Sequence, residues 1–427
     1  MTATLRTSPG LARDPALPRR DDLLDEELVA ARLQGLDREP RTVAGCVRVR
    51  ARYRPGESLR TTYRLVDERG DSRLVSARMF TAAKAPAKFL LARDEAARQG
   101  APDDSVLLDE PMNTVFWVFP QDRKLRGLDR LTDPPEELRA VFGRPWLRSE
   151  LVAYTPEKAA TVRCSDAGGV TVGFAKVHAG DDGRHSVDTL AAVRRSLPPA
   201  GGPTLPEPVG YLSDLRMSLL SPVPGQALHH LPRAEVPAAM AALGETLSML
   251  HRGSVAALPP FTRLDPDRLT TAGVLLQTAR PDLADLTGAV VSALLAAPRR
   301  PAPAALLHGD LHPKNVLVHD TGIGLVDLDQ AAAGPAGAEL GGTLARLWCP
   351  RPHDPIDPDT AAAAADALLA AYARPPSADD LRWFAAAALL VERAVRAVSR
   401  VDVATLAELE RVLSTSLEWA TEGAHPR

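Results

Sequence analysis

The sequence predicts an α+β protein with a β-rich N-terminal half and a mainly helical C-terminal half. Apolar and polar residues alternate in short runs between residues 45 and 80 and again between 149 and 178, which is the period of β-strands. From about residue 231 onward, alanine-rich stretches carry apolar residues at helical spacing. A segment rich in Pro and Gly near 221–226 separates the two halves. We therefore expect two lobes with a ligand site between them.

Composition excludes several classes of protein. The chain has 427 residues, which is more than one ordinary domain, and a formal net charge of −3, which favours neither nucleic acid nor anionic membranes as partners. No apolar stretch reaches the length of a membrane span, and the N-terminus lacks the apolar core of a signal peptide. Three scattered cysteines are too few for a disulfide framework. We expect a cytoplasmic protein that binds neither nucleic acid nor membranes.

The N-terminal part is expected to consist of a tail and a β-rich extension. Residues 1–22 are polar, with scattered Pro and Arg, and are predicted to be a disordered tail. Residues 23–145 are predicted to form the β-rich extension. The expected elements are a helix over 21–36, three strands between 45 and 80, a helix over 82–98, and two strands over 105–111 and 113–120.

Two β-meanders in this half resemble each other. Tyr53-Arg54-Pro55 aligns with Tyr154-Thr155-Pro156, and Ala77-Arg78 aligns with Ala175-Lys176. With a one-residue gap, Tyr63-Arg64 aligns with Val162-Arg163. The pattern indicates an internal duplication, in which residues 23–145 are a degenerate copy of a lobe at 146–225. The alternative is that any two short meanders with Pro turns look alike.

The C-terminal part, residues 226–427, is predicted to be a helical lobe. Its long periodic stretches cover 235–252, 283–297, 359–373 and 379–400. Only residues 306–330 interrupt the helices, with short apolar runs typical of strands.

That interruption carries the residues with the clearest chemistry. It contains His308-Gly309-Asp310, then Asn315, then a turn and an apolar strand that ends at Asp327. Phosphoryl transfer requires a carboxylate that orients and deprotonates the attacking hydroxyl, and Mg²⁺ held against the phosphates. Mg²⁺ binds a few hard oxygen ligands beside phosphate oxygens. Asp310 suits the role of base, and Asn315 and Asp327 suit metal binding.

The run HGDLHPKNVLV and the following strand with its aspartate resemble the aminoglycoside phosphotransferase and choline kinase superfamily. The resemblance implies a bilobal protein-kinase-like fold that uses ATP and Mg²⁺. It implies that Asp310 is the catalytic base, that Asn315 and Asp327 bind Mg²⁺, and that His308 braces the loop. Protein kinases have Arg where Gly309 stands, so the resemblance is to the small-molecule branch.

The resemblance extends to the nucleotide site. Residues 174–177 resemble the strand that carries the phosphate-binding lysine, which implies that role for Lys176. A lysine at a strand end with its head in solvent is the alternative. Residues 219–228 resemble the hinge that meets adenine, which implies contacts from Ser221 and Val223.

Three further positions depart from the family pattern or are less specific. Asp329 stands where the family has Glu, so it is expected to be a third Mg²⁺ ligand or a helix N-cap. Glu339 stands where Asp is expected, which changes the local loop. Asp188, on the next predicted helix, is the expected acidic partner of Lys176.

Together these residues predict an ATP-dependent kinase that phosphorylates a hydroxyl of a small molecule, which could be aminoglycoside-like, a sugar or an amino alcohol. An acidic pocket for a cationic acceptor could come from Asp354, Asp357 and Asp359. Trp383, Glu392 and Arg393 lie where the family often builds its acceptor pocket, although an ordinary amphipathic helix is the favoured interpretation. The alternative functions are a catalytically silent kinase-like binding protein and a protein kinase.

Overall fold

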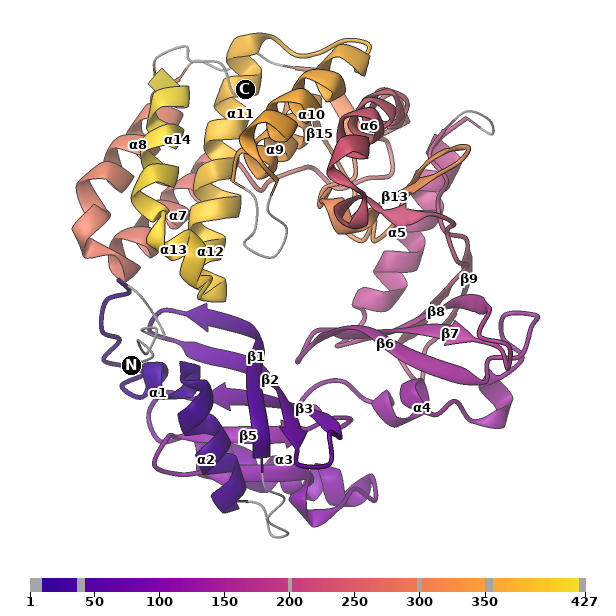
Figure 1. Ribbon diagram of the computed structural model, residues 1–427, viewed down its shortest axis with the longest axis vertical. Coiled ribbons are helices and arrows are strands. Elements are labelled where there is room, and N and C mark those ends of the chain that lie inside the picture. Colours follow the sequence, from indigo (N-terminus) through magenta and orange to yellow (C-terminus); the bar gives the residue numbers. More distant parts are fainter. Residues whose placement is uncertain (1–9, 37–42, 199–201, 298–301, 350–355, 422–427) are drawn as a thin grey trace.

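The computed structural model describes residues 10–36, 43–198, 202–297, 302–349 and 356–421. Three bodies follow one another around a ring in Figure 1. The first is the N-terminal sheet with its helices, in indigo and purple, and the second is the magenta sheet. The third is the helical region, from rose to yellow, which returns to the first body.

The first body is a five-stranded antiparallel sheet with helices on it. Its elements are α1 Arg20–Leu24, α2 Glu26–Leu36, β1 Val43–Arg54, β2 Ser58–Asp67, β3 Ser72–Met79, α3 Ala85–Arg98, β4 Val106–Asp109 and β5 Thr114–Val118. The strand order is β1-β2-β3-β5-β4.

The second body repeats this plan. Its elements are α4 Leu128–Thr132, β6 Arg148–Thr155, β7 Ala159–Ser165, β8 Thr171–His178, α5 Asp182–Ser196, β9 Pro208–Leu212 and β10 Met217–Leu220. The strand order is β6-β7-β8-β10-β9. In both bodies a helix follows the third strand, and the last strand pairs with the third.

The pairing registers align the two sheets residue by residue. Arg78 lies opposite Arg60 on β2, and Lys176 lies opposite Thr161 on β7. Tyr53 lies five residues before the first residue of β2, and Tyr154 lies five residues before the first residue of β7. Arg78 therefore occupies the position of Lys176 in a repeated topology. The gapped alignment of Tyr63 with Val162 is wrong, because these registers place Thr61 at the position of Val162.

The third body is helical, with short strands where the motif lies. Its helices are α6 Val236–Leu250, α7 Pro266–Ala279, α8 Ala284–Ala296, α9 Ala336–Trp348, α10 Pro358–Ala371, α11 Ala378–Ala388, α12 Val395–Arg400, α13 Val403–Ala407 and α14 Leu409–Thr421. Its strands are β11 Gln226–Ala227, β12 Ala304–Leu307, β13 Val316–His319, β14 Gly322–Leu325 and β15 Ala332–Pro335. A π-helical stretch, η7 Leu389–Ala394, joins α11 to α12.

The expectation of a disordered tail over residues 1–22 is wrong for residues 10–22, and residues 1–9 lie outside the described part of the chain. Leu17 is 1% exposed. The Ala12 N–H donates to the Ala279 carbonyl at 2.8 Å, and Asp14 accepts from the Tyr53 hydroxyl at 2.7 Å. The polar composition predicted disorder because it gave no sign that these groups find partners on α7 and β1.

Two contacts connect the first body to the other two. Its apolar side chains share one continuous core with those of α7, α8, α11 and α14, and α12 packs on β1. Toward the second body, Glu157 in the β6–β7 turn accepts from Arg60 at 3.2 Å, Arg78 at 2.6 Å and Arg123 at 2.7 Å. The second body has its own core beneath its sheet. Within the described residues, no helix is both long and apolar enough to cross a membrane.

Candidate functional site

The loop between β12 and β13 carries Asp310, and its shape depends on glycine. Gly309 has φ +79°, in the left-handed region. A Cβ at this position would lie 1.8 Å from the Gln330 carbonyl oxygen, which is far inside van der Waals contact. No side chain fits there, which accounts for Gly at the position where protein kinases have Arg.

Buried polar groups brace this loop from two sides. His308 is fully buried, and its Nε2 lies 3.0 Å from the Val326 carbonyl oxygen after β14. From α9, the Glu339 carboxylate accepts the backbone N–H groups of His308 at 3.1 Å and Gly309 at 2.9 Å. The same carboxylate lies 3.0 Å from His251 Nε2. The Glu in place of the expected Asp thus holds the loop that carries Asp310.

Asn315 lies at the far end of the same loop. It is 6% exposed, and its Nδ2 donates to the Asp310 carbonyl oxygen at 3.1 Å. Its backbone carbonyl accepts from the Val326 N–H at 3.0 Å, which ties the loop to the segment after β14. Because the amide nitrogen is engaged, Oδ1 is the atom that can ligate a cation.

Lys176 on β8 joins the second body to the third. Its Nζ lies 2.9 Å from Asp327 Oδ1 and 2.5 Å from Asp329 Oδ2. Burial lowers the pKa of Lys176, but the two carboxylates outweigh it and hold the pKa above its ordinary value. Asp188 is wrong as the acidic partner, because it is exposed on α5 while Ser186 of that helix donates to Asp329.

The acidic pair fits a hard divalent cation. Asp327 and Asp329 have side chains 48% and 31% exposed, and Lys176 supplies one positive charge against their two negative charges. Among the described residues no group of three or more His, Cys, Asp or Glu has metal-binding geometry. A cation here would therefore depend on these carboxylates, the Asn315 amide oxygen and oxygens of a bound phosphate, which is the usual environment of Mg²⁺.

The segment after β10 contains the two residues expected to meet adenine. The Ser221 N–H donates to the Glu207 carbonyl at 2.9 Å, and its hydroxyl accepts from the Glu207 N–H at 2.8 Å. Of its backbone groups, the Ser221 carbonyl is thus the one left for a ligand. In the described part of the chain no group accepts the Val223 N–H, and Pro222 and Pro224 on either side have none to offer.

Asp310 itself faces arginines that the sequence gave no reason to select. Its Oδ1 lies 3.4 Å from Arg263 Nη1 and 3.5 Å from Arg396 Nη2. Burial raises the pKa of Asp310, but the charges of Arg396 and Arg263 outweigh it and hold the pKa well below its usual range. Asp310 is therefore ionised at neutral pH. Only six of the 51 basic residues are lysines, so an individual arginine does not stand out from the background.

Among the described residues expected near an acceptor, Glu392 shares the partners Arg263 and Arg396 with Asp310. It lies in η7 and pairs with Arg346 of α9. Trp383 is buried and donates its Nε1–H to the Leu294 carbonyl at 2.9 Å, and Arg393 donates to the Cys349 carbonyl. Both are structural contacts.

Two of the aspartates expected to contribute an acidic pocket, Asp357 and Asp359, lie at the start of α10. Asp357 caps α10 by accepting the Thr360 N–H at 2.9 Å, and Asp354 lies outside the described residues. Asp359 lies in the first turn of the same helix.

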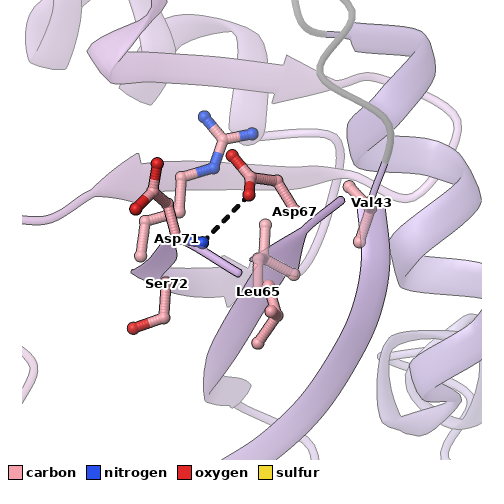
Figure 2. Close-up of a pocket in the computed structure, with 7 residues that line it drawn as sticks. Val43, Leu65, Asp67, Asp71 and Ser72 are labelled. Atoms are coloured by element: carbon pink, nitrogen blue, oxygen red, sulfur yellow. Dashed lines mark hydrogen bonds between the residues drawn. The ribbon is translucent and has the colours of Figure 1, made fainter. Parts of the chain in front are cut away.

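A separate pocket lies on the first sheet, which does not carry Lys176. Figure 2 shows it at the β2–β3 turn, where the Asp71 N–H donates to Asp67 Oδ1 at 3.0 Å. Its volume of about 80 Å³ is well below the roughly 300 Å³ of small-molecule sites, so it has no part in the site. It is lined by Val43, Leu65, Val66, Asp67, Asp71, Ser72 and Arg73.

Comparison with known proteins gives a match over the region that contains this site. Residues 176–375 match the model of the phosphotransferase enzyme family. No curated protein sequence matches the chain.

Among solved structures, the chain is similar to a thermostable mutant of aminoglycoside phosphotransferase APH(4)-Ia in its apo form. The two are 17% identical, the match covers 66% of this chain and 97% of that one, and the TM-score is 0.50. A ternary complex of a thermostable mutant of that enzyme with ADP and hygromycin B is 16% identical, with 69% and 100% coverage and a TM-score of 0.51. At these identities the likeness establishes the fold, and the predicted kinase-like fold is confirmed.

Proposed function

We propose, since residues 176–375 match the model of the phosphotransferase enzyme family, that the protein is an ATP- and Mg²⁺-dependent kinase of a small molecule with a hydroxyl group. The observation that carries the proposal is the ion pair between Lys176 of one lobe and Asp327 and Asp329 of the other. It brings a cation and two metal-competent carboxylates together beside the loop that holds Asp310.

The residues divide the chemistry between them. Asp310 accepts the proton of the acceptor hydroxyl as its oxygen bonds to the γ-phosphorus, and the bond from that phosphorus to the bridging oxygen breaks, which releases ADP. Its ionised state at neutral pH suits a base that works while the hydroxyl is losing its proton. Lys176 would exchange its carboxylate partners for the α- and β-phosphates of the nucleotide.

Asn315, Asp327 and Asp329 would hold Mg²⁺, which neutralises charge on the β- and γ-phosphate oxygens. The Ser221 carbonyl and the Val223 N–H would meet the adenine edge. The contact of Asp329 with Lys176 and Ser186 favours the ligand role over that of a helix N-cap.

The test is ATP consumption with Mg²⁺ against a panel of sugars, amino alcohols and aminoglycosides, with Asp310→Asn beside the wild type. We expect acceptor-dependent turnover that falls by roughly 10²- to 10⁴-fold in the variant, the usual contribution of a general base, with Mg·ATP binding retained. A wild-type protein that does not bind Mg·ATP would contradict the proposal and support a silent binding protein. Phosphorylation of generic proteins in preference to every small molecule would support a protein kinase.

A further inference from the structure

Three arginines from separate elements converge on the carboxylates at the acceptor side of Asp310. Arg263 precedes α7, Arg346 lies on α9 and Arg396 lies on α12. We call Arg263, Arg346 and Arg396 the arginine cluster. All three pair with Glu392, and Arg263 and Arg396 also pair with Asp310.

The charges of this cluster do not balance. Three guanidinium groups face two carboxylates, which leaves one positive charge beside the position of the attacking hydroxyl. Buried Arg393 adds a further cation from the neighbouring position in η7. Glu392 is nearly enclosed, with a side chain 12% exposed. Burial raises its pKa, but the charges of Arg346 and Arg396 outweigh burial and hold the pKa below its ordinary value. Glu392 is therefore ionised, and its charge is already paired with arginines.

The three arginines of the cluster differ in how closely their N–H donors are bound by other groups of the protein. Arg346 is 13% exposed and donates to both the Leu311 carbonyl and Glu392. Arg263 and Arg396 are 25% and 26% exposed, and their contacts with Asp310 are long, at 3.4 and 3.5 Å. Their remaining ion-pair contacts, with Glu392, are longer still, at 3.9 and 3.8 Å. Arg263 also donates to the side-chain oxygen of Gln330. A guanidinium has five N–H donors in a rigid fork that matches carboxylates and phosphates, so both arginines keep donors for a ligand anion.

We propose that the acceptor is an anionic hydroxyl compound, with a carboxylate, sulfate or phosphate group that Arg263 and Arg396 bind while its hydroxyl lies against Asp310. This rests on the proposed function and narrows its acceptor class. A polycationic aminoglycoside or a protonated amino alcohol would place like charges together in a partly enclosed site, which costs affinity. The transfer step is the one given above, and the anionic group takes no part in bond making.

The test compares three sugars that differ mainly in the charge of one substituent: glucuronate, glucose and glucosamine. For each, kcat/KM for Mg·ATP-dependent phosphorylation is measured in the wild type, Arg396→Gln, Arg263→Gln and Arg396→Lys. Arg98→Gln on α3, with a side chain 67% exposed, is the matched control. The readout is the ratio of kcat/KM for glucuronate to that for glucose, because a general loss of activity cancels in a ratio.

We expect the wild type to rank glucuronate above glucose and glucose above glucosamine. The ratio should fall about tenfold or more in each Gln variant, as the loss of one charge-assisted hydrogen bond predicts, and recover in part in Arg396→Lys. Arg98→Gln should keep the wild-type ratio. A wild type that prefers glucosamine, or an unchanged ratio in both Gln variants, would overturn the inference. In the latter case the arginines serve the transferring phosphoryl group or Asp310 for every acceptor alike.

If none of the three sugars is phosphorylated, calorimetric binding of glucuronate and of inorganic sulfate to the Mg·ADP-loaded protein decides. Binding that weakens in Arg396→Gln and not in Arg98→Gln supports the inference. No binding of either anion to a protein that binds Mg·ADP overturns it and leaves the kinase proposal standing. A protein that does not bind Mg·ADP overturns the kinase proposal itself.

Discussion

At the scale of single residues, Gly309 is a position where the backbone conformation and its close neighbours exclude any side chain. Its positive φ and the 1.8 Å approach of the Gln330 carbonyl to a Cβ there combine two penalties. Gly309→Ala should lower the free energy of unfolding by more than the roughly 1–2 kcal/mol of the left-handed conformation alone, and should lower activity by displacing Asp310. Gly342→Ala is the control, because it lies inside α9 with nothing within 4 Å of its Cβ.

Thermal unfolding of both variants by circular dichroism measures the difference. The Gly342 variant should match or slightly exceed wild-type stability, as Ala in place of Gly inside a helix usually does. Equal losses in the two variants would contradict the assigned role of Gly309.

The same scale shows what the sequence can and cannot predict about the site. Asp310, Asn315 and Asp327 were found because their types and spacing match a reaction. Glu339 was noticed only as a departure, although its carboxylate holds the backbone of His308 and Gly309. The arginine cluster comes from three segments far apart in the chain, and no local pattern reports such a convergence.

At the scale of elements, the β6–β7 turn carries a buried carboxylate that arginines outside the second sheet hold. Glu157 has a side chain 4% exposed and meets Arg60, Arg78 and Arg123, whose Nε atoms are buried without partners among the described residues. Burial raises the pKa of Glu157, but its bonds to Arg123 and Arg78 outweigh it and lower the pKa from 4.5 to about 2. Ionised Glu157 therefore stabilises the fold above about pH 4.5, and this stabilisation is lost as the pH falls toward 2.

Glu157→Gln should remove up to about 3 kcal/mol of the change in unfolding free energy between pH 5 and pH 2. It should also destabilise the protein at pH 7, because three arginines lose their shared anion. Urea denaturation at several pH values measures both. Glu150→Gln, at an exposed pair with Arg163, should change stability by less than about 0.5 kcal/mol. A Glu157 variant with the wild-type pH dependence would contradict this account.

Alternation and helical spacing predicted β1 to β8 and the helices α2, α3, α6, α8, α10 and α11, but they did not predict α7, α9 or α14. The ungapped part of the internal alignment placed Arg78 over Lys176, as the sheet registers do. The gapped part was wrong by two residues. The helix expected over 379–400 was predicted as one element, but it contains the π-helical stretch η7. Period alone does not reveal an inserted residue in a helix, and such insertions are frequent at functional sites.

At the scale of the whole molecule, the first body and the helical lobe share a core that starts with residues near the N-terminus. Leu17 is 1% exposed in this core, which also contains Leu276 of α7. Leu17→Ala should lower the free energy of unfolding by roughly 2–5 kcal/mol, the usual cost of a cavity at a buried leucine. Leu28→Ala, 38% exposed on α2, should cost less than about 0.5 kcal/mol.

Chemical denaturation followed by tryptophan fluorescence measures both variants. A Leu17 variant as stable as the Leu28 variant would show that the N-terminal segment is not part of the folded core.

The first body touches both of the others, at Glu157 on one side and at α12 and α7 on the other. Two lobes joined by one flexible segment can open by a hinge rotation about that segment. Three bodies joined pairwise form a closed ring, in which no body can rotate relative to the others unless one of the three joints changes. Substrate entry in this protein should therefore require a change at one of its three joints. Among their ionic contacts, those of Lys176 with Asp327 and Asp329 are more exposed than those of Glu157, so salt should weaken the joint at Lys176 more.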